Sequence, residues 1–430
     1  MNRELRVLID GQVAGTLDQL ANGRLRFDYD LTYQQRQNPT PLSLSMPVQE
    51  RSHGHATVAP WLWGLLPDNI DVLRRWAREF HFSDVSPFAL LSTPVGEDCA
   101  GGVQFVSPSR LDALFTDSGD VAWLTEADVA ARLHQMRADS TAWRGDGTTS
   151  EPRFVGQFSL AGRQAKTALL LENGRWGVPS GRIPTTHILK PPIAEFRDQE
   201  LNEHLCLNAA SRAGLAAAET RVLTFGSESA VVITRYDRRL DGGRFVRIHQ
   251  EDMCQALGVP PERKYQVDGG PGPAEIGRLI RAAMPDATAE ADIWRFVDAL
   301  AWNWIVGGTD AHAKNYSLLL AGRQVRLAPL YDITSILPYE NERHARLAMK
   351  IGDGYELVSH RNPWPVTSAR LGLDSDRVSA RVAELCARAP VAFEEAVGAP
   401  EVAALNRPAA SRLAYLVAKR AARCAKLVDE

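Results

Sequence analysis

The chain has 430 residues, of which 45% are hydrophobic and 23% charged, and its formal net charge is -3 at pH 7. This length allows two or three domains with sizeable cores, and the nearly balanced charge argues against a globally basic nucleic-acid-binding protein. Five scattered cysteines predict neither a disulfide framework nor a zinc site and favour a reducing compartment. The first residues lack an apolar signal core and no run of 18 apolar residues occurs, so we expect a cytoplasmic protein without membrane contact.

The first part of the chain predicts a small α/β region. Apolar and polar residues alternate in three runs over 5–30, with turn residues between them, which is typical of an antiparallel meander. The next apolar periodicity predicts a helix that begins at Pro67 and Asp68. A polar, glycine-rich stretch near 138–152 predicts a linker. We therefore expect an N-terminal region over 1–148.

The middle of the chain is rich in strand-like runs, and the last part is mainly helical in its periodicity. The middle part contains a hairpin signal at Asn173-Gly174 and one inserted helix that ends before Gly214. From about residue 251 the apolar residues follow a 3.6-residue period. We predict an α+β protein in which a β-rich part at 149–245 is followed by an all-α lobe at 246–430.

The segment GGTDAHAKN, residues 307–315, places polar side chains between two strongly apolar segments. We expect a buried helix before it to hold the loop that carries Asp310 and Asn315. Asp332 follows, after a strand-like run. Phosphoryl transfer uses such a set, because one carboxylate accepts the proton of the attacking hydroxyl while an Asn and a second carboxylate hold Mg²⁺. The plainer alternative, in which Asp310 caps a turn that Asn315 closes, is weakened by this second Asp.

An upstream lysine supplies another part of a kinase site. Lys190 ends an apolar strand-like run and is followed by two prolines. Kinases place such a lysine on the α- and β-phosphates and orient it with a helix glutamate. Glu200 and Glu203 are available, and we favour Glu203 because apolar residues lie close to its helix face. A solvated lysine stays open as the alternative. The loop SLAGRQAKT, residues 159–167, is a weaker candidate for a turn that covers phosphates.

Other kinds of site find little support. His53 and His55 lack partner residues at metal-ligand spacing and predict a solvated loop. The tryptophans fall mostly at helical spacing, which favours core packing over base stacking. The basic side chains of the last helix predict a solvated face, with DNA contact as the lesser alternative: Lys419, Arg420, Arg423 and Lys426.

Several segments together resemble the HipA family of bacterial toxin kinases. They occur in the family's order over roughly 155–335: FSLAGRQAKTALL, PTTHILKPP, ITRYDRR, HQEDMCQALG, KYQVDGGPG, GGTDAHAKNYSLLL and LAPLYDI. The N-terminal meander and the segment LLPDN are also similar to the family. The resemblance implies a two-lobed, protein-kinase-like fold with an added N-terminal region. It also implies a Ser/Thr protein kinase of a type II toxin–antitoxin system that uses ATP and Mg²⁺.

The resemblance implies a role for each matching residue. Asp310 would be the catalytic base, and Asn315 and Asp332 would hold Mg²⁺. Ser159 would be an autophosphorylation site whose modification flips its loop out and switches the kinase off. The implied nucleotide contacts come from this loop, from two strands and from the catalytic region: Ala161, Gly162, Arg163, Gln164, Ala165, Lys166, Lys190, Thr234, Arg235, Tyr236, His312 and Tyr331.

The chain departs from the family pattern at three positions. Ala165 and Thr234 stand where acidic residues occur in relatives, and Ala311 replaces a common glycine. The first two changes could alter nucleotide affinity and loop stability. No reacting group is missing, so we do not expect an inactive kinase.

The resemblance also implies partners and a target. The partner would be a small HipB-like helix-turn-helix antitoxin that binds operator DNA, with DNA contact by the kinase itself secondary. The target would be an aminoacyl-tRNA synthetase, glutamyl in particular, whose phosphorylation halts translation and favours dormancy and persistence. Two rivals stay open: a small-molecule kinase of the aminoglycoside or choline kinase type, and a non-catalytic co-repressor that acts with the antitoxin on DNA. The autophosphorylation serine and the N-terminal region argue against the first, and the intact reacting residues argue against the second.

Overall fold

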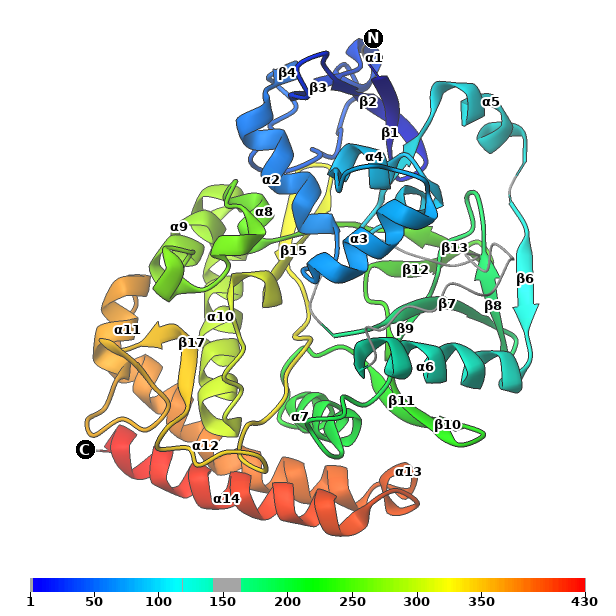
Figure 1. The fold of residues 1–430 in the computed structure, drawn as a ribbon. Helices are drawn as coiled ribbons and strands as arrows, with labels where there is room; N and C mark the ends of the chain where they lie inside the picture. The colour runs from blue at the N-terminus through cyan, green and yellow to red at the C-terminus, as the bar shows by residue number, and fades with distance from the viewer. Residues whose placement is uncertain (1–2, 118, 142–163, 430) are drawn as a thin grey trace.

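The structure is a computed structural model that describes residues 3–117, 119–141 and 164–429. Figure 1 shows the N-terminal region, in blue, across the top of a larger body. The sheet of the middle part lies on the right of this body, and the helices of the C-terminal part lie on the left and along the bottom. The arrangement is an α+β fold, as predicted.

The N-terminal region is built on a five-stranded antiparallel sheet with the order β4-β3-β2-β1-β5. Its first three strands are the predicted meander, and a turn at Asp10-Gly11, where φ is positive at both residues, joins β1 to β2. The strands are β1 (Arg3–Ile9), β2 (Gln12–Gln19), β3 (Leu25–Tyr29), β4 (Ser52–His53) and β5 (Val103–Val106). The helices are α1 (Leu31–Gln34), α2 (His55–Leu65), α3 (Ile70–Glu79), α4 (Pro87–Leu91), the 3₁₀ helix η1 (Pro94–Glu97) and α5 (Pro108–Thr116).

A helix was expected to begin at Pro67 and Asp68. It is present, but it begins at Ile70, so the predicted start is wrong. The side chain of Asn69 accepts a hydrogen bond from the backbone N–H of Asp71 at 3.0 Å, which makes Asn69 the N-cap of α3. Asp68 belongs instead to the connector 66–69 between α2 and α3. Its carboxylate leaves the N-terminal region and contacts lysines of the C-terminal part.

The middle part is a six-stranded antiparallel sheet with the order β10-β11-β9-β7-β8-β6. The predicted hairpin joins β7 and β8 through Asn173 and Gly174, whose φ values of 50° and 75° suit a tight primed turn. The strands are β6 (Val121–Leu124), β7 (Thr167–Glu172), β8 (Arg175–Pro179), β9 (His187–Lys190), β10 (Thr220–Phe225) and β11 (Glu228–Thr234). The strands β12 (Arg238–Asp241) and β13 (Arg244–Arg247) form a separate hairpin.

Two helices accompany this sheet. α6 (Glu126–Thr141) covers it through the fully buried Val129 and Leu133, and α7 (Gln199–Arg212) is the predicted inserted helix. β6 pairs with β8, although β6 and α6 come before the predicted boundary at residue 148. The sheet therefore takes in a segment that we assigned to the N-terminal region.

The C-terminal part is mainly helical, but the expectation of an all-α lobe is wrong. It contains a three-stranded sheet, β14-β15-β16, and a hairpin of β17 and β18. A helix was expected from residue 251, but the preceding strand extends to Asp252 and only a four-residue helix follows, which is too short for its period to show. The strands are β14 (His249–Asp252), β15 (Ser317–Ala321), β16 (Gln324–Leu327), β17 (Arg346–Ile351) and β18 (Gly354–Glu356). The helices are α8 (Met253–Ala256), η2 (Pro261–Arg263), η3 (Gln266–Asp268), α9 (Pro273–Ala283), α10 (Asp286–Val306), η4 (Ala313–Asn315), α11 (Trp364–Leu371), α12 (Ser375–Gly398), α13 (Pro400–Ala403) and α14 (Arg407–Asp429).

The core of the C-terminal part surrounds α10. Trp302 and Trp304 of this helix are 0% and 1% exposed, which confirms core packing for these two tryptophans. Arg420 of α14 was expected on a solvated face, and this is wrong. Its guanidinium is buried, donates to the backbone oxygens of Trp304 and Leu357 at 2.9 Å each, and pairs with Glu342 at 3.0 Å. Arg420 therefore ties α14 to the end of α10.

The thiols of all five cysteines are free and buried. Over the described residues, no helix combines the length and the apolar character that a membrane span needs.

Candidate active site

The polar loop GGTDAHAKN directly follows α10 and is held rigidly. Gly307 ends the helix in the left-handed conformation, with φ 73°. The short helix η4 then closes the loop, and the side-chain N–H of Asn315 donates to the backbone oxygen of Asp310 at 2.9 Å. The buried helix expected before the loop is present, and it fixes the place from which Asp310 projects.

Asp310 is the exposed carboxylate of this loop. The hydroxyl of Tyr265 donates a hydrogen bond to its Oδ1 at 2.6 Å. On the other side, the backbone oxygen of Thr309 accepts from the N–H of Ala348 on β17. Asp310 is thus accessible to a substrate hydroxyl while its backbone and one carboxylate oxygen are held.

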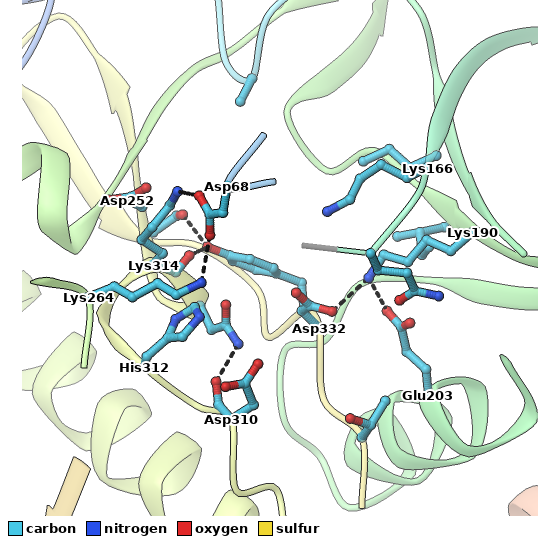
Figure 2. Close-up of a pocket in the computed structure, with 18 of the residues that line it drawn as sticks. Asp68, Lys166, Lys190, Glu203, Asp252, Lys264, Asp310, His312, Lys314 and Asp332 are labelled. Atoms are coloured by element: carbon cyan, nitrogen blue, oxygen red, sulfur yellow. Dashed lines mark hydrogen bonds and ion pairs between the residues drawn. The ribbon is translucent and has the colours of Figure 1, made fainter. Parts of the chain in front are cut away.

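Lys190, at the end of β9, contacts two carboxylates at once. Its Nζ lies 2.7 Å from Oε1 of Glu203 on α7 and 2.7 Å from Oδ1 of Asp332 (Figure 2). Glu203 is 1% exposed, whereas Glu200 accepts a hydrogen bond from Ser229 at 3.0 Å. The helix face that we favoured is therefore the one that meets Lys190.

Asp332 stands in a backbone conformation that is uncommon for residues other than glycine. Its φ is 55°, in the left-handed region, where a residue with a Cβ is disfavoured. Such conformations persist where the surroundings hold them, and they concentrate at functional sites. The conformation here directs the carboxylate toward Lys190.

The opposite charges of the lysines and carboxylates around Lys190 stabilise one another's ionised forms. Burial opposes the charge on Lys190, but the carboxylates of Asp332 and Glu203 outweigh it and raise the pKa of Lys190 above its ordinary value. Burial would raise the pKa of Asp332, but Lys190 and Lys166 hold that pKa well below its usual range. For Lys166, burial and the neighbouring charge of Lys190 lower the pKa to about 8. At neutral pH both lysines are therefore charged, and Asp332 is ionised.

Asn315 and Asp332 have the chemistry of a magnesium site. Mg²⁺ prefers oxygen ligands, commonly takes only one or two of them from carboxylates, and keeps several waters. The amide nitrogen of Asn315 is occupied by the backbone oxygen of Asp310, so its amide oxygen is the atom available to a metal. The carboxylate of Asp332 is 36% exposed and ionised. The two side chains fit the ion that the family resemblance implies.

The residues expected around adenine lie at another edge of the same cavity. Thr234, Arg235 and Tyr236 line it, and the ring of Tyr236 lies 5.8 Å from that of Tyr331. The hydroxyl of Tyr331 bonds to Ser317 at 2.6 Å and donates to the backbone oxygen of Lys314, so its position is fixed.

The side chain of Arg235 serves another purpose. Its guanidinium donates to Asp237 at 2.7 Å and pairs with Asp98 of the N-terminal region at 3.4 Å. A nucleotide at this edge would therefore meet the backbone of Arg235 and not its charge.

His312 is buried beside Asp310. Its ring lies edge-on to that of Tyr265, with 5.0 Å between ring centroids, and its Nδ1 has no hydrogen-bond partner among the described residues. Burial and the charge of Lys264 lower the pKa of His312 to about 3, so the ring is neutral at physiological pH. A neutral imidazole with an unused nitrogen can contact a bound ligand.

The loop expected to cover phosphates is described only at its end. Ser159, Ala161, Gly162 and Arg163 lie outside the described residues. Gln164 lines the cavity and donates to the backbone oxygen of Pro191 at 3.0 Å, and Lys166 also lines it. Ala165 is not among the lining residues.

One cavity of about 400 Å³ gathers most of these groups. Figure 2 shows Lys166, Lys190 and Glu203 on one side of it and Asp310 and His312 on another, with Asp332 between them. A cavity of this size is typical of small-molecule and cofactor sites.

Three charged residues of the cavity were not predicted. Asp68, Lys264 and Lys314 lie together at the end of the cavity away from Glu203. Tyr265, the neighbour of Asp310, was also given no role. A signal was present, since these residues stand in segments that resemble the family, LLPDN, KYQVDGGPG and HAKN. No local spacing rule connects these segments to one another.

Two regions of the chain match known protein domains. Residues 5–106 match the HipA N-terminal domain, and residues 158–393 match the HipA-like C-terminal domain. The protein Y4mE of Sinorhizobium fredii is 33% identical over 391 residues, which cover 89% of each chain. The serine/threonine-protein kinase toxin HipA of Shewanella oneidensis is 27% identical over 444 residues, which cover 96% of each chain.

A solved structure has the same fold. It is the complex of Shewanella oneidensis HipA with HipB and operator DNA, and the similarity has a TM-score of 0.83 at 24% identity. It covers 99% of this chain and 98% of that one, so the N-terminal region and the rest of the chain share one arrangement with it. From the domain matches and the fold together, this chain belongs to the HipA family of toxin kinases.

Proposed function

We propose that this protein is a Ser/Thr protein kinase that transfers the γ-phosphoryl group of ATP to a protein hydroxyl. One observation carries the proposal. A lysine that contacts a helix glutamate and a second carboxylate faces the same cavity as Asp310 and Asn315. Phosphoryl transfer requires positioning and charge stabilisation more than covalent chemistry, and these groups supply both.

Asp310 would accept or orient the proton of the attacking hydroxyl. It is exposed, so a substrate side chain can reach it, and Tyr265 fixes one of its oxygens. Hydrogen bonds from Tyr265 and Asn315 fix the direction of the carboxylate. This limits the directions from which a substrate hydroxyl can approach Asp310. The hydroxyl of Tyr265 occupies a place next to Asp310 similar to the one that a substrate hydroxyl would need.

Lys190 and Lys166 would bind the phosphates of ATP. Glu203 holds Lys190 from the side of α7, and Asp332 contacts it from the cavity. Mg²⁺, when bound by Asn315 and Asp332, would neutralise phosphate charge. The nucleoside end would lie among Thr234, Arg235, Tyr236 and Tyr331. His312 would contact the nucleotide beside Asp310, and the loop over 161–166 would cover the phosphates.

We further propose that the protein acts with a HipB-like helix-turn-helix antitoxin and with operator DNA mainly through it. The support is the shared fold with a HipA that was solved in complex with HipB and operator DNA. Inactivation through Ser159 and an aminoacyl-tRNA synthetase as the target, such as the glutamyl enzyme, stay predictions from the family resemblance. So do translation inhibition, persistence and a cytoplasmic location.

The test is transfer of labelled phosphate from ATP by purified protein, with Asp310→Asn as the disabled variant. We expect Mg²⁺-dependent labelling of Ser or Thr in protein, and loss of a general base should slow it by about 10²–10⁴-fold. Asp268→Asn is the matched control, because this exposed carboxylate lies near Tyr265 in the chain but does not line the cavity. Labelling of choline or an aminoglycoside in place of protein would favour a small-molecule kinase. Binding of antitoxin and DNA with no transfer to any acceptor would favour a non-catalytic co-repressor.

A further inference from the structure

A carboxylate of the N-terminal region enters the candidate active site. Asp68 lies on the connector 66–69, and its two oxygens contact two different lysines. Oδ1 lies 2.5 Å from Nζ of Lys314, and Oδ2 lies 2.6 Å from Nζ of Lys264 (Figure 2). The side chains of Asp68, Lys264 and Lys314 are 12%, 9% and 3% exposed, so little water competes for these contacts.

Each lysine belongs to a segment that carries a residue of the proposed reaction. Lys314 stands between His312 and Asn315 in the loop after α10. Lys264 stands directly before Tyr265, whose hydroxyl donates to Asp310. Backbone contact also links the two segments, because the N–H of Ala313 donates to the backbone oxygen of Lys264 at 3.2 Å. Asp68 thus connects the loop of Asp310 to the segment that holds Asp310 from the side.

The charges require this carboxylate. Burial would raise the pKa of Asp68, but Lys314 and Lys264 outweigh it, so the pKa lies below its ordinary value and Asp68 is ionised at neutral pH. Asp252 also interacts electrostatically with Lys314, and burial raises the pKa of Asp252 to about 6. Without Asp68, the two nearly buried ammonium groups would lose the one carboxylate that contacts both of them, which is strongly unfavourable.

The N-terminal region that carries this connector is held on α8 and β14 by contacts that do not involve the two lysines. Gln255 of α8 donates to the backbone oxygen of Trp61 in α2 at 2.9 Å. Glu251 of β14 accepts hydrogen bonds from Ser43 and from the backbone N–H of Leu44. A Cβ on Gly64 would lie 2.6 Å from Cγ of Gln255, so α2 packs closely on α8. The position of Asp68 therefore follows from how the N-terminal region docks.

We propose that Asp68 is a positioning residue of the phosphoryl-transfer centre, supplied by the N-terminal region. It holds the loop of Asp310 and the Lys264–Tyr265 segment in one arrangement. This inference rests on the proposed kinase function. It makes the N-terminal region a part of the centre and not only an added module.

The test compares Asp68→Asn and Asp68→Glu with the unaltered chain. We expect Asp68→Asn to lower kcat by about 10-fold to 100-fold, since small displacements of reacting groups have effects of this order. KM for ATP should stay within about two-fold, because Lys166 and Lys190 are untouched. Asp68→Glu keeps the charge and should restore part of the lost kcat. A purely structural role would change kcat only through the fraction of folded protein, which calorimetry measures.

Ser43→Ala is the matched control, because it weakens the same docking surface without touching either lysine. We expect it to change the melting temperature but to leave kcat per folded molecule close to that of the unaltered chain. Hydrogen exchange adds a readout that needs no activity. In Asp68→Asn, exchange should quicken at 264–266 and 310–316 and stay unchanged in the six-stranded sheet.

The outcomes separate the two levels of the proposal. A kcat of Asp68→Asn equal to or above that of the unaltered chain overturns the inference, and so does an equal loss in Ser43→Ala. Unchanged exchange at 264–266 and 310–316 also overturns it. If the unaltered chain transfers no phosphate to any protein, the kinase function fails and the role of Asp68 in that reaction fails with it.

Discussion

The side chains of the candidate site are linked by two bridges of opposite charge pattern. In one, Lys190 joins the carboxylates of Glu203 and Asp332. In the other, Asp68 joins the amino groups of Lys264 and Lys314. Lys190, of the six-stranded sheet, contacts Asp332 of the C-terminal part. Asp68, of the N-terminal region, contacts two lysines of the C-terminal part. Removing the centre of either bridge leaves two like charges close together.

Glu203 can be tested against its neighbour on the same helix. Glu203→Gln removes the charge that holds Lys190 from α7, and we expect kcat to fall by about 10-fold or more, as misplacement of a phosphate-binding group would cause. Glu200→Gln should have little effect, because Glu200 contacts Ser229 and not Lys190. Steady-state transfer rates measure both. An equal loss in the two variants would contradict the role of Glu203.

The pKa of Lys166 predicts a proton effect on ATP binding. In the nucleotide-free protein this pKa is lowered to about 8 by burial and by Lys190, so Lys166 loses its proton as the pH rises through 8. Bound triphosphate favours the charged form and should raise the pKa. Between pH 8 and the higher bound value, ATP binding should therefore take up a proton and weaken with rising pH. Calorimetry in buffers of different ionisation enthalpy measures the uptake, which should vanish near pH 6 and in Lys166→Met.

The residues of the site differ in how far the sequence could predict them. Lys190, Asp310, Asn315 and Asp332 stand in short segments whose spacing suggests the chemistry. Asp68 could not be predicted in this way, because its partners lie 196 and 246 residues further along the chain. Sequence patterns report local periodicity and spacing, whereas an ion pair of this kind depends on how two separate parts of the fold dock.

At the scale of elements, the turn over 263–272 positions Tyr265 against Asp310. The backbone oxygen of Tyr265 accepts from the N–H of Gly270 at 3.0 Å, and the backbone N–H of Lys350 on β17 donates to Gln266. The turn follows β14 and α8, where we expected a helix to begin at residue 251. Elements of three or four residues are too short to show a period, so tertiary contacts decide their conformation.

Substitutions at Gly269 and Gly270 test whether the shape of this turn positions Asp310. A Cβ on Gly270 would lie 2.0 Å from the backbone oxygen of Arg263 and 2.7 Å from that of Tyr265, so Gly270→Ala must displace the segment. We expect transfer to fall by about 10-fold or more.

Gly269→Ala is the control for this change. Gly269 has φ 83°, and nothing lies within 4 Å of the added atom, so the substitution costs only about 1–2 kcal/mol of backbone strain. Transfer rates per folded molecule should therefore stay near those of the unaltered chain. Equal rates in Gly269→Ala and Gly270→Ala would show that the turn does not position Asp310.

At the scale of the whole molecule, a buried ion cluster joins the N-terminal region to the β-rich part. Asp98 lies 3.0 Å from a guanidinium nitrogen of Arg238, 2.9 Å from one of Arg247 and 3.4 Å from one of Arg235. The docking of the N-terminal region on the β-rich part depends on such contacts. The sequence shows the charges without showing which pairs they form.

Asp98→Asn should destabilise the protein by about 3–5 kcal/mol, because it leaves three buried guanidinium groups short of one negative charge. Burial would raise the pKa of Asp98, but Arg238, Arg247 and Arg235 hold it well below its ordinary value. A carboxyl whose pKa is lower in the folded than in the unfolded protein stabilises the fold fully above its unfolded-state pKa, near pH 4. This stabilisation is lost progressively as the pH falls below that value. The difference between variant and unaltered chain should therefore shrink below pH 4. Urea unfolding at pH 7 and pH 3.5 measures it, with the exposed Asp112→Asn as control.

Arg420 has a consequence for the order in which the active site can be completed during synthesis. Ribosomes add residues from the N-terminus at about 5–20 per second. The residues that line the cavity end at Tyr339, so all of them are made before Arg420. Until Arg420 is made, the backbone oxygens of Trp304 and Leu357 lack their donor, and α14 cannot brace the end of α10 from which Asp310 projects. A nascent chain that already contains every reacting group therefore still lacks the support of its catalytic loop, and the kinase would become competent only late in its own translation.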